Sequence, residues 1–214
     1  MIDFGCIEQI ARSFFTDGRG SHGWDHTLRV VRLAQRIARA EGADMDVVVT
    51  AAYLHDIGRS VEDESEGSLC HADYGGRLAE TILHRNGFRF TAAQQDNVLH
   101  CIRSHRFRGK ETPVTLEAKV VFDADKLDAI GAIGIARAYL FAGEIGARLH
   151  CPEIPLSETL PYTAADTGYR EYAVRLRKIR DIMLTAEGRR MANDRHRFME
   201  GFFDRFLQEY EGER

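Results

Sequence analysis

The chain has 214 residues, of which 44% are hydrophobic and 29% charged, and its formal net charge is −4. This balance is typical of a globular protein that buries a core of useful size. The acidic charge argues against a nucleic-acid groove, which usually leaves a basic surface. No apolar run approaches the length of a membrane span.

The cysteines and the first residues indicate the compartment. The four cysteines are scattered and form no Cys-x-x-Cys pair, which favours reduced thiols. Residues 1–5 show no basic segment followed by an apolar one, so we expect no signal peptide. We therefore expect a cytoplasmic protein without nucleic-acid or membrane partners, and no oligomeric state is predicted.

Apolar residues recur at helical spacing along most of the chain. Helices are expected over residues 2–15, 24–41, 47–57, 71–86, 92–105, 116–142, 168–184 and 187–210. Residues 60–69 are polar, acidic and aperiodic, which predicts a loop, and residues 147–167 contain three prolines and read as a connection. We predict one all-α domain over residues 1–214, with a core at about 20–145 and a helical extension at about 168–210.

A histidine and an aspartate stand side by side at the end of an apolar run. His55 and Asp56 follow Leu54 in the last turn of the helix that Gly58 is expected to end. An unpaired carboxylate inside an apolar helix is very unfavourable, so the pair needs a partner. A metal ion beside the end of the helix would satisfy both side chains.

Two further residues complete a ligand set. His26 falls in the first turn of one predicted helix, and Asp125 lies on the apolar face of another. Asp123 could replace Asp125, but the two point to different faces. Two imidazoles and two carboxylates suit a hard or borderline divalent ion such as Mn, Mg, Ni, Fe or Zn. We predict that His26, His55, Asp56 and Asp125 hold one such ion, which activates water.

At these residues the chain resembles the HD-domain superfamily of metal-dependent phosphohydrolases. The superfamily pattern is a first His, then His-Asp, then a distal Asp, as in His26, His55-Asp56 and Asp125. The surrounding stretches are similar to the branch of small stand-alone bacterial HD hydrolases: residues 21–30, 51–58, 123–131, 134–137, 185–189 and 195–199. The likeness covers about residues 20–210.

The resemblance implies a compact HD-domain helical bundle with additional C-terminal helices. It also implies hydrolysis of a phosphate ester or anhydride, often on a nucleotide, and some relatives are nucleoside-triphosphate pyrophosphohydrolases. Asp56 would then serve both as ligand and as catalytic residue.

Departures from the two-metal branch of the superfamily concern His71 and His105. His71-Ala-x-x-Gly75 is similar to one motif of that branch, and Ser104-His105 keeps one His of another, but the Gly-Tyr-Pro signature is absent. This argues against a complete second metal site. We expect His71 and His105 to be catalytic, contacting phosphate or a metal-bound water, although each could also be a residue at a helix end.

Positive side chains near the ligands are candidate phosphate contacts. Arg59 follows the His-Asp pair and Lys126 follows Asp125, and both are predicted to bind substrate, with ordinary solvated roles as the alternative. Arg106, Arg108 and Lys110 form a small basic cluster. No general acid is identified, and a carboxylate between Glu62 and Glu66 could assist water.

Two other functions stay open at this point. Some HD relatives hold two irons and perform oxygen chemistry, for which only His71 and His105 could supply the extra ligands. The chain could also be a non-catalytic nucleotide-binding regulatory module, but such modules commonly lose a ligand and this chain keeps all four.

Overall fold

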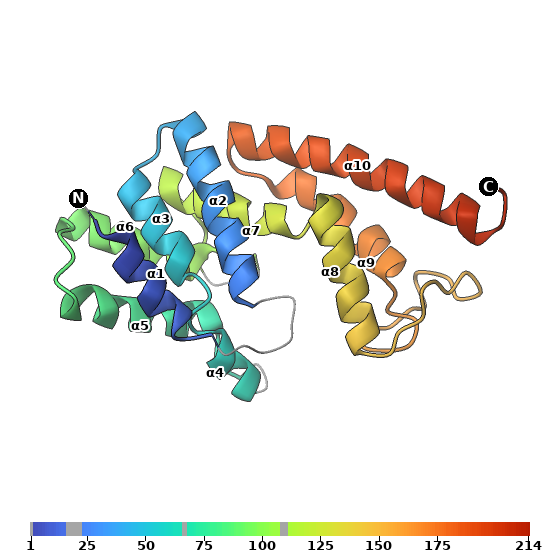
Figure 1. Ribbon diagram of the computed structural model, residues 1–214, viewed down its shortest axis with the longest axis horizontal. Helices are drawn as coiled ribbons and strands as arrows, with labels where there is room; N and C mark the ends of the chain where they lie inside the picture. The colour runs from blue at the N-terminus through green and yellow to red at the C-terminus, as the bar shows by residue number, and fades with distance from the viewer. Residues whose placement is uncertain (1, 16–22, 66–67, 108–110) are drawn as a thin grey trace. The chain divides into compact units, whose positions relative to one another are not determined.

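The computed structural model describes residues 2–15, 23–65, 68–107 and 111–214. These residues form helices and no strand (Figure 1), so the predicted all-α class is confirmed. The chain divides into two compact units: Met1–Asp125 with Leu184–Glu187, and Lys126–Met183 with Gly188–Arg214. The prediction of one domain over residues 1–214 stays a prediction.

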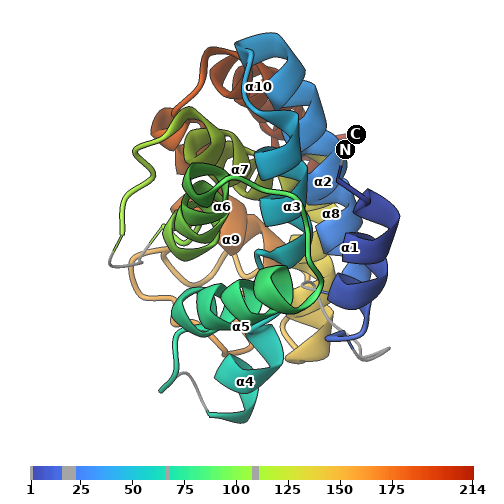
Figure 2. The same cartoon turned by 90° about the vertical axis from the view of Figure 1, so that its left-hand side faces the viewer.

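The first unit is built around a fully buried helix. Its helices are α1 (Phe4–Arg12), α2 (Trp24–Glu41), α3 (Met45–Leu54), α4 (Arg59–Glu64), α5 (His71–Arg85), α6 (Ala92–Ser104) and most of α7 (Leu116–Asp128), whose residues after Asp125 belong to the second unit. Helix α3 packs against α1, α2 and α6 (Figure 2), and all its residues from Val47 to Leu54 are buried. Because α3 is apolar on every side, neighbours must surround it.

Local capping signals set several of these boundaries. Gly42 ends α2 in the left-handed conformation, with φ +74°, where glycine has no steric penalty. Asp44 caps α3 by accepting from the backbone N–H groups of Asp46 and Val47. Thr91 opens α6 through a reciprocal capping box with Gln94.

Two predictions near the His-Asp pair were wrong in detail. Helix α3 ends at Leu54, and residues 55–58 form a turn. The segment expected as a loop begins with the short helix α4. Its only described buried side chain is Glu62, so no apolar period could reveal it. Gly58 explains the tight turn, because a Cβ there would lie 2.4 Å from the His71 carbonyl oxygen.

The second unit begins at Lys126, in the last turn of α7, just before a break in the long helical stretch predicted over residues 116–142. Helix α7 stops at Asp128, and Gly131, with φ +78°, opens α8 (Gly131–Glu144), so the stretch predicted as one helix is two helices. The chain continues through α9 (Gly168–Val174), the 3-10 helix η1 (Leu176–Ile182) and α10 (Ala186–Tyr210), whose first two residues belong to the first unit.

Aromatic side chains form the core of the second unit. Phe203 stacks on Tyr172 with ring centroids 4.2 Å apart, and Tyr169 packs against the edge of Phe203 at 5.6 Å. The stretch predicted as one helix over residues 168–184 changes from α to 3-10 geometry at Arg175. In the described part of the chain, no helix combines the length and apolarity that crossing a membrane requires.

Candidate metal centre

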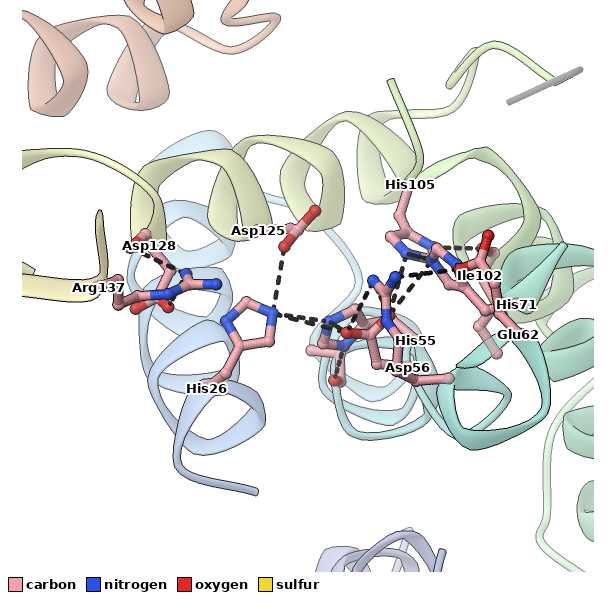
Figure 3. Close-up of polar contacts among 12 residues, drawn as sticks. His26, His55, Asp56, Glu62, His71, Ile102, His105, Asp125, Asp128 and Arg137 are labelled. Atoms are coloured by element: carbon pink, nitrogen blue, oxygen red, sulfur yellow. Dashed lines mark hydrogen bonds and ion pairs between the residues drawn. The ribbon is translucent and has the colours of Figure 1, made fainter. Parts of the chain in front are cut away.

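Three elements of the first unit, with the turn after α3, bring the predicted ligands together (Figure 3). His26 stands in the first turn of α2, and His55 caps the C-terminus of α3. Asp56 follows in the turn, and Asp125 lies near the end of α7. His26, His55 and Asp56 are at most 2% exposed, so the fold withdraws three ionisable groups from water at one point.

The distances define a first group of ligand atoms. His26 Nε2 lies 3.4 Å from His55 Nε2, 3.8 Å from Asp56 Oδ2 and 3.3 Å from Asp125 Oδ1. His55 Nε2 lies 3.6 Å from the same Asp56 oxygen. Ligand atoms of His26, His55 and Asp56 all fall within 4.8 Å of one another, and Asp125 joins them through His26.

The structure distinguishes Asp125 from Asp123, the alternative ligand. Asp123 is fully buried, and its carboxylate accepts hydrogen bonds from the backbone N–H groups of Leu184 and Thr185 and from the Thr185 hydroxyl, at 2.6–2.9 Å. These bonds fasten the segment before α10 to α7. Asp123 therefore has a structural role, whereas Asp125 faces His26.

A second group shares Asp56 with the first. His71, the first residue of α5, and His105, the C-cap of α6, place their Nε2 atoms 3.4 Å and 3.5 Å from Asp56 Oδ1 and 3.1 Å from each other. Ligand atoms of Asp56, His71 and His105 also lie within 4.8 Å of one another. The two oxygens of one carboxylate thus face two separate sets of imidazoles.

The imidazoles are fixed from behind. His55 Nδ1 donates to the carbonyl oxygen of Ala52 at 2.7 Å, and His105 Nδ1 donates to that of Ile102 at 2.6 Å. A carbonyl oxygen only accepts, so each Nδ1 carries the hydrogen. In a neutral ring the Nε2 lone pair then points toward Asp56. Lone pairs facing a carboxylate oxygen repel it unless a proton or a metal cation lies between them.

The charge states favour a metal cation over a proton. Burial lowers the pKa of His55 to about 4, although the Asp56 carboxylate acts in the opposite direction. Burial likewise lowers the pKa of His71 to about 4. Burial would raise the pKa of Asp56, but His55, Arg59 and His105 outweigh it and hold that pKa well below its usual range. The neutral imidazoles of His55 and His71 beside the ionised carboxylate of Asp56 form a donor set that fits a divalent metal.

Arg59 lies at the edge of the second group. Its guanidinium donates to both oxygens of Asp56, at 3.2 Å and 3.4 Å, and to Glu62 at 3.1 Å. About a quarter of the side chain is exposed, so the positive charge can also meet a ligand from solvent. Lys126 follows Asp125 near the end of α7 and is half-buried, and its role stays a prediction.

The sequence analysis did not predict that Glu62 and Arg106 contact each other beside His71. Glu62 accepts from His71 Nδ1 and lies 2.8 Å from Arg106 Nη1. Neither residue sits in a periodic segment, so the sequence carried no signal for the contact. Arg108 and Lys110, the other members of the predicted basic cluster, lie outside the described residues.

Comparison with known proteins agrees with this arrangement. The family model described as HD domain matches residues 23–130, which include all the predicted ligands. The uncharacterized protein YpgQ of Bacillus subtilis is 34% identical over 199 residues, covering 90% of this chain and 86% of YpgQ. Ribonuclease Y of Thermotoga maritima is 34% identical over 123 residues, but the match spans only 22% of that protein.

Solved structures show the same likeness. The crystal structure of YpgQ in complex with ADP aligns with a TM-score of 0.73 and 31% identity, covering 97% of both chains. An HD-superfamily hydrolase from Bacillus thuringiensis aligns with a TM-score of 0.75 and 27% identity, covering 97% of this chain and 96% of that one. With the family match over residues 23–130 and His26, His55 and Asp56 gathered at one point, the chain belongs to the HD domain family.

Proposed function

We propose that this protein is a metal-dependent phosphohydrolase that cleaves a phosphate ester or anhydride of a nucleotide. The observation that carries the proposal is the meeting of imidazole Nε2 atoms at both oxygens of the buried Asp56. A divalent cation between these atoms would relieve the repulsion among the lone pairs, and the likeness to an HD-superfamily hydrolase supports hydrolysis as the reaction.

His26, His55, Asp56 and Asp125 would hold the first divalent ion, which could be Mn, Mg, Ni, Fe or Zn. Such an ion supplies a Lewis acid and lowers the pKa of bound water. Asp56, His71 and His105 would hold a second ion more weakly, because they share Asp56 and lie beside the positive Arg59. This departs from the single ion expected from sequence, which could not show His71 and His105 meeting at Asp56.

The positive groups at the rim suit a phosphorylated substrate. Arg59 is partly exposed beside Asp56, and its planar guanidinium can donate to phosphate oxygens as charge develops on them. We also retain Lys126 as a proposed phosphate contact. A nucleotide is favoured because the similar protein YpgQ was crystallised in complex with ADP.

The test combines metal reconstitution with product analysis. Metal-stripped protein is resupplied with each candidate ion and incubated with nucleoside mono-, di- and triphosphates and a short RNA, and the products are separated by chromatography. Monophosphate plus pyrophosphate would establish a triphosphate pyrophosphohydrolase, and nucleoside plus phosphate a phosphomonoesterase. Cleaved RNA would instead favour a nuclease.

Matched variants make the result specific. Asp56→Ala should abolish turnover, while Asp194→Ala, which removes an exposed carboxylate from α10, should not. Oxygen uptake by iron-loaded protein would support the di-iron alternative. Folded, metal-loaded protein that binds nucleotides but turns none over would reject the enzyme and favour a regulatory module.

A further inference from the structure

Glu62 gathers contacts from three separate parts of the first unit. It lies on α4, is 8% exposed, and its Oε2 accepts from His71 Nδ1 and from Arg59 Nη1 at 3.1 Å. Its Oε1 lies 2.8 Å from Nη1 of Arg106, which follows α6. Both carboxylate oxygens are therefore engaged on the side of His71 that faces away from Asp56.

The position of His71 in its helix explains why a side chain is needed there. His55 and His105 follow the ends of helices, and each finds a backbone carbonyl three residues earlier to accept from its Nδ1. His71 is the first residue of α5, so no preceding helical turn offers that carbonyl. The Glu62 carboxylate takes its place.

The consequence concerns which nitrogen of His71 carries the hydrogen. An ionised carboxylate only accepts hydrogen bonds, so Nδ1 must be the protonated nitrogen. The Nε2 lone pair then points at Asp56 Oδ1 and His105 Nε2. A carboxylate behind a ligating imidazole fixes its orientation and raises its basicity as a metal ligand.

The surrounding charges keep Glu62 in this role. Burial would raise the pKa of Glu62, but the His71 hydrogen bond and the charges of Arg106 and Arg59 lower it below its ordinary value. Both oxygens of Glu62 are already engaged by His71, Arg59 and Arg106. Its contacts therefore favour holding His71 in place over assisting water, the role suggested from sequence.

We propose that Glu62 is a positioning residue that holds His71 as the Nδ1–H tautomer, so that His71 Nε2, His105 Nε2 and Asp56 Oδ1 together can bind a divalent cation. The cation part of this inference rests on the proposed function. The tautomer part does not, because it follows from the hydrogen bond alone.

The first experiment reads the tautomer directly. Nitrogen-15 NMR of the metal-free protein, with the His71 signals identified by their loss in His71→Gln, should show Nδ1 protonated and Nε2 unprotonated. Glu62→Ala should shift His71 toward the Nε2–H form, and Glu62→Gln, which keeps an acceptor oxygen, should fall between. Glu64→Ala, on the exposed side of the same helix, should match wild type. An unchanged His71 spectrum in Glu62→Ala would overturn the proposal.

The second experiment measures metal affinity without relying on catalysis. In a His26→Ala background, which removes a ligand of the first group, Mn²⁺ titration should report the second group. Adding Glu62→Ala should weaken binding by about 10- to 100-fold, as other outer carboxylates do, with Glu62→Gln in between and Glu64→Ala unchanged. Equal affinity in all folded variants would contradict the metal role.

The two readouts separate this inference from the proposed function. Wild-type protein that binds no ion but shows the predicted tautomer would refute the metal-dependent function and the cation role, while leaving the Glu62–His71 arrangement intact. If the protein binds ions and turns over nucleotides, but the His71 tautomer does not change in Glu62→Ala, only the positioning role is refuted.

Discussion

The two units bury charged groups in opposite ways. In the second unit, Asp166 Oδ1 lies 2.7 Å from Arg170 Nη1, and the other guanidinium nitrogens donate to the hydroxyl and carbonyl oxygens of Thr159. Each charge there has its partner within the unit. In the first unit, Asp56 is also buried and is paired with Arg59, but each of its oxygens additionally faces imidazole Nε2 atoms. A buried ion with matched donors stabilises the fold, whereas one facing further acceptors fits a cation.

The histidines of the two units show the same contrast. His150 in the second unit lies edge-on to Tyr169 and Tyr210, with centroids 4.8 Å and 5.0 Å away, and so contributes to an aromatic cluster. His55 and His105 are fixed through Nδ1 and direct Nε2 at a carboxylate. Burial alone therefore does not mark a histidine as a candidate metal ligand. The direction of its second nitrogen is the more informative observation.

The largest expected effect is a loss of turnover on substitution of Asp56, which substitution of Asp166 should not cause. Asp56→Asn should lower turnover by about 1,000-fold or more, as loss of a central catalytic group does, and should abolish tight metal binding. Asp166→Asn weakens the ion pair with Arg170 and should lower the free energy of unfolding. Turnover per folded molecule should stay within about twofold of wild type, because this ion pair belongs to the second unit and not to the candidate metal centre. Steady-state kinetics with melting curves would check both. Similar losses of turnover in the two variants would break the comparison.

The second prediction concerns pH and the metal-free protein. The folded-state pKa of His55 and of His71 is about 4, against about 6.5 in the unfolded chain. The unfolded state therefore binds protons first as the pH falls, and the free energy of unfolding should decrease between pH 6.5 and 4, by about 2 kcal/mol per histidine at pH 5. Asp56, with its pKa well below 3.8, keeps its contribution throughout this window.

Urea titrations at several pH values in the presence of a chelator would measure this dependence. Burial also lowers the pKa of His150 in the second unit, and His150→Phe removes that contribution. Between pH 6.5 and 4 a slope from His55 and His71 should remain in His150→Phe and should change when Mn²⁺ is added. If the pH dependence of the unfolding free energy disappeared in His150→Phe, it would come from His150 and not from His55 and His71, which would contradict the prediction.

The third prediction tests a carboxylate of the first unit that has matched donors. Asp123→Ala leaves the N–H groups of Leu184 and Thr185 without their acceptor, and each unsatisfied buried donor costs about 1–3 kcal/mol. We expect a loss of about 2–4 kcal/mol in unfolding free energy, while Mn²⁺ affinity of the folded fraction stays near wild type. Loss of metal binding at full stability would instead make Asp123 a ligand.

The smallest expected effect compares two glycines. Gly58→Ala places a Cβ 2.4 Å from the His71 carbonyl oxygen and 2.8 Å from the Gly75 backbone nitrogen, so α5 must shift at the cost of about 1–3 kcal/mol. Gly143→Ala in α8 meets nothing within 4 Å and should be neutral or stabilising by up to about 1 kcal/mol. Chemical denaturation would show the difference, and equal effects would mean that the turn after Asp56 tolerates a side chain.

Several features could be predicted because their causes are local. The ends of α2, α3 and α6 follow from Gly42, Asp44 and Thr91, each of which satisfies backbone groups a few residues away. The His-Asp pair stood out because an apolar helix does not tolerate it without a partner.

What the amino-acid sequence determined by itself was therefore the helical class, most helix boundaries and the residues that could bind a metal. Only the tertiary structure decided that Asp123 holds a segment in place, that His71 and His105 meet at Asp56, and that Glu62 stands behind His71. The physical reason is that periodicity gives the face on which a side chain lies, whereas the distance between two side chains depends on how helices far apart in the sequence pack.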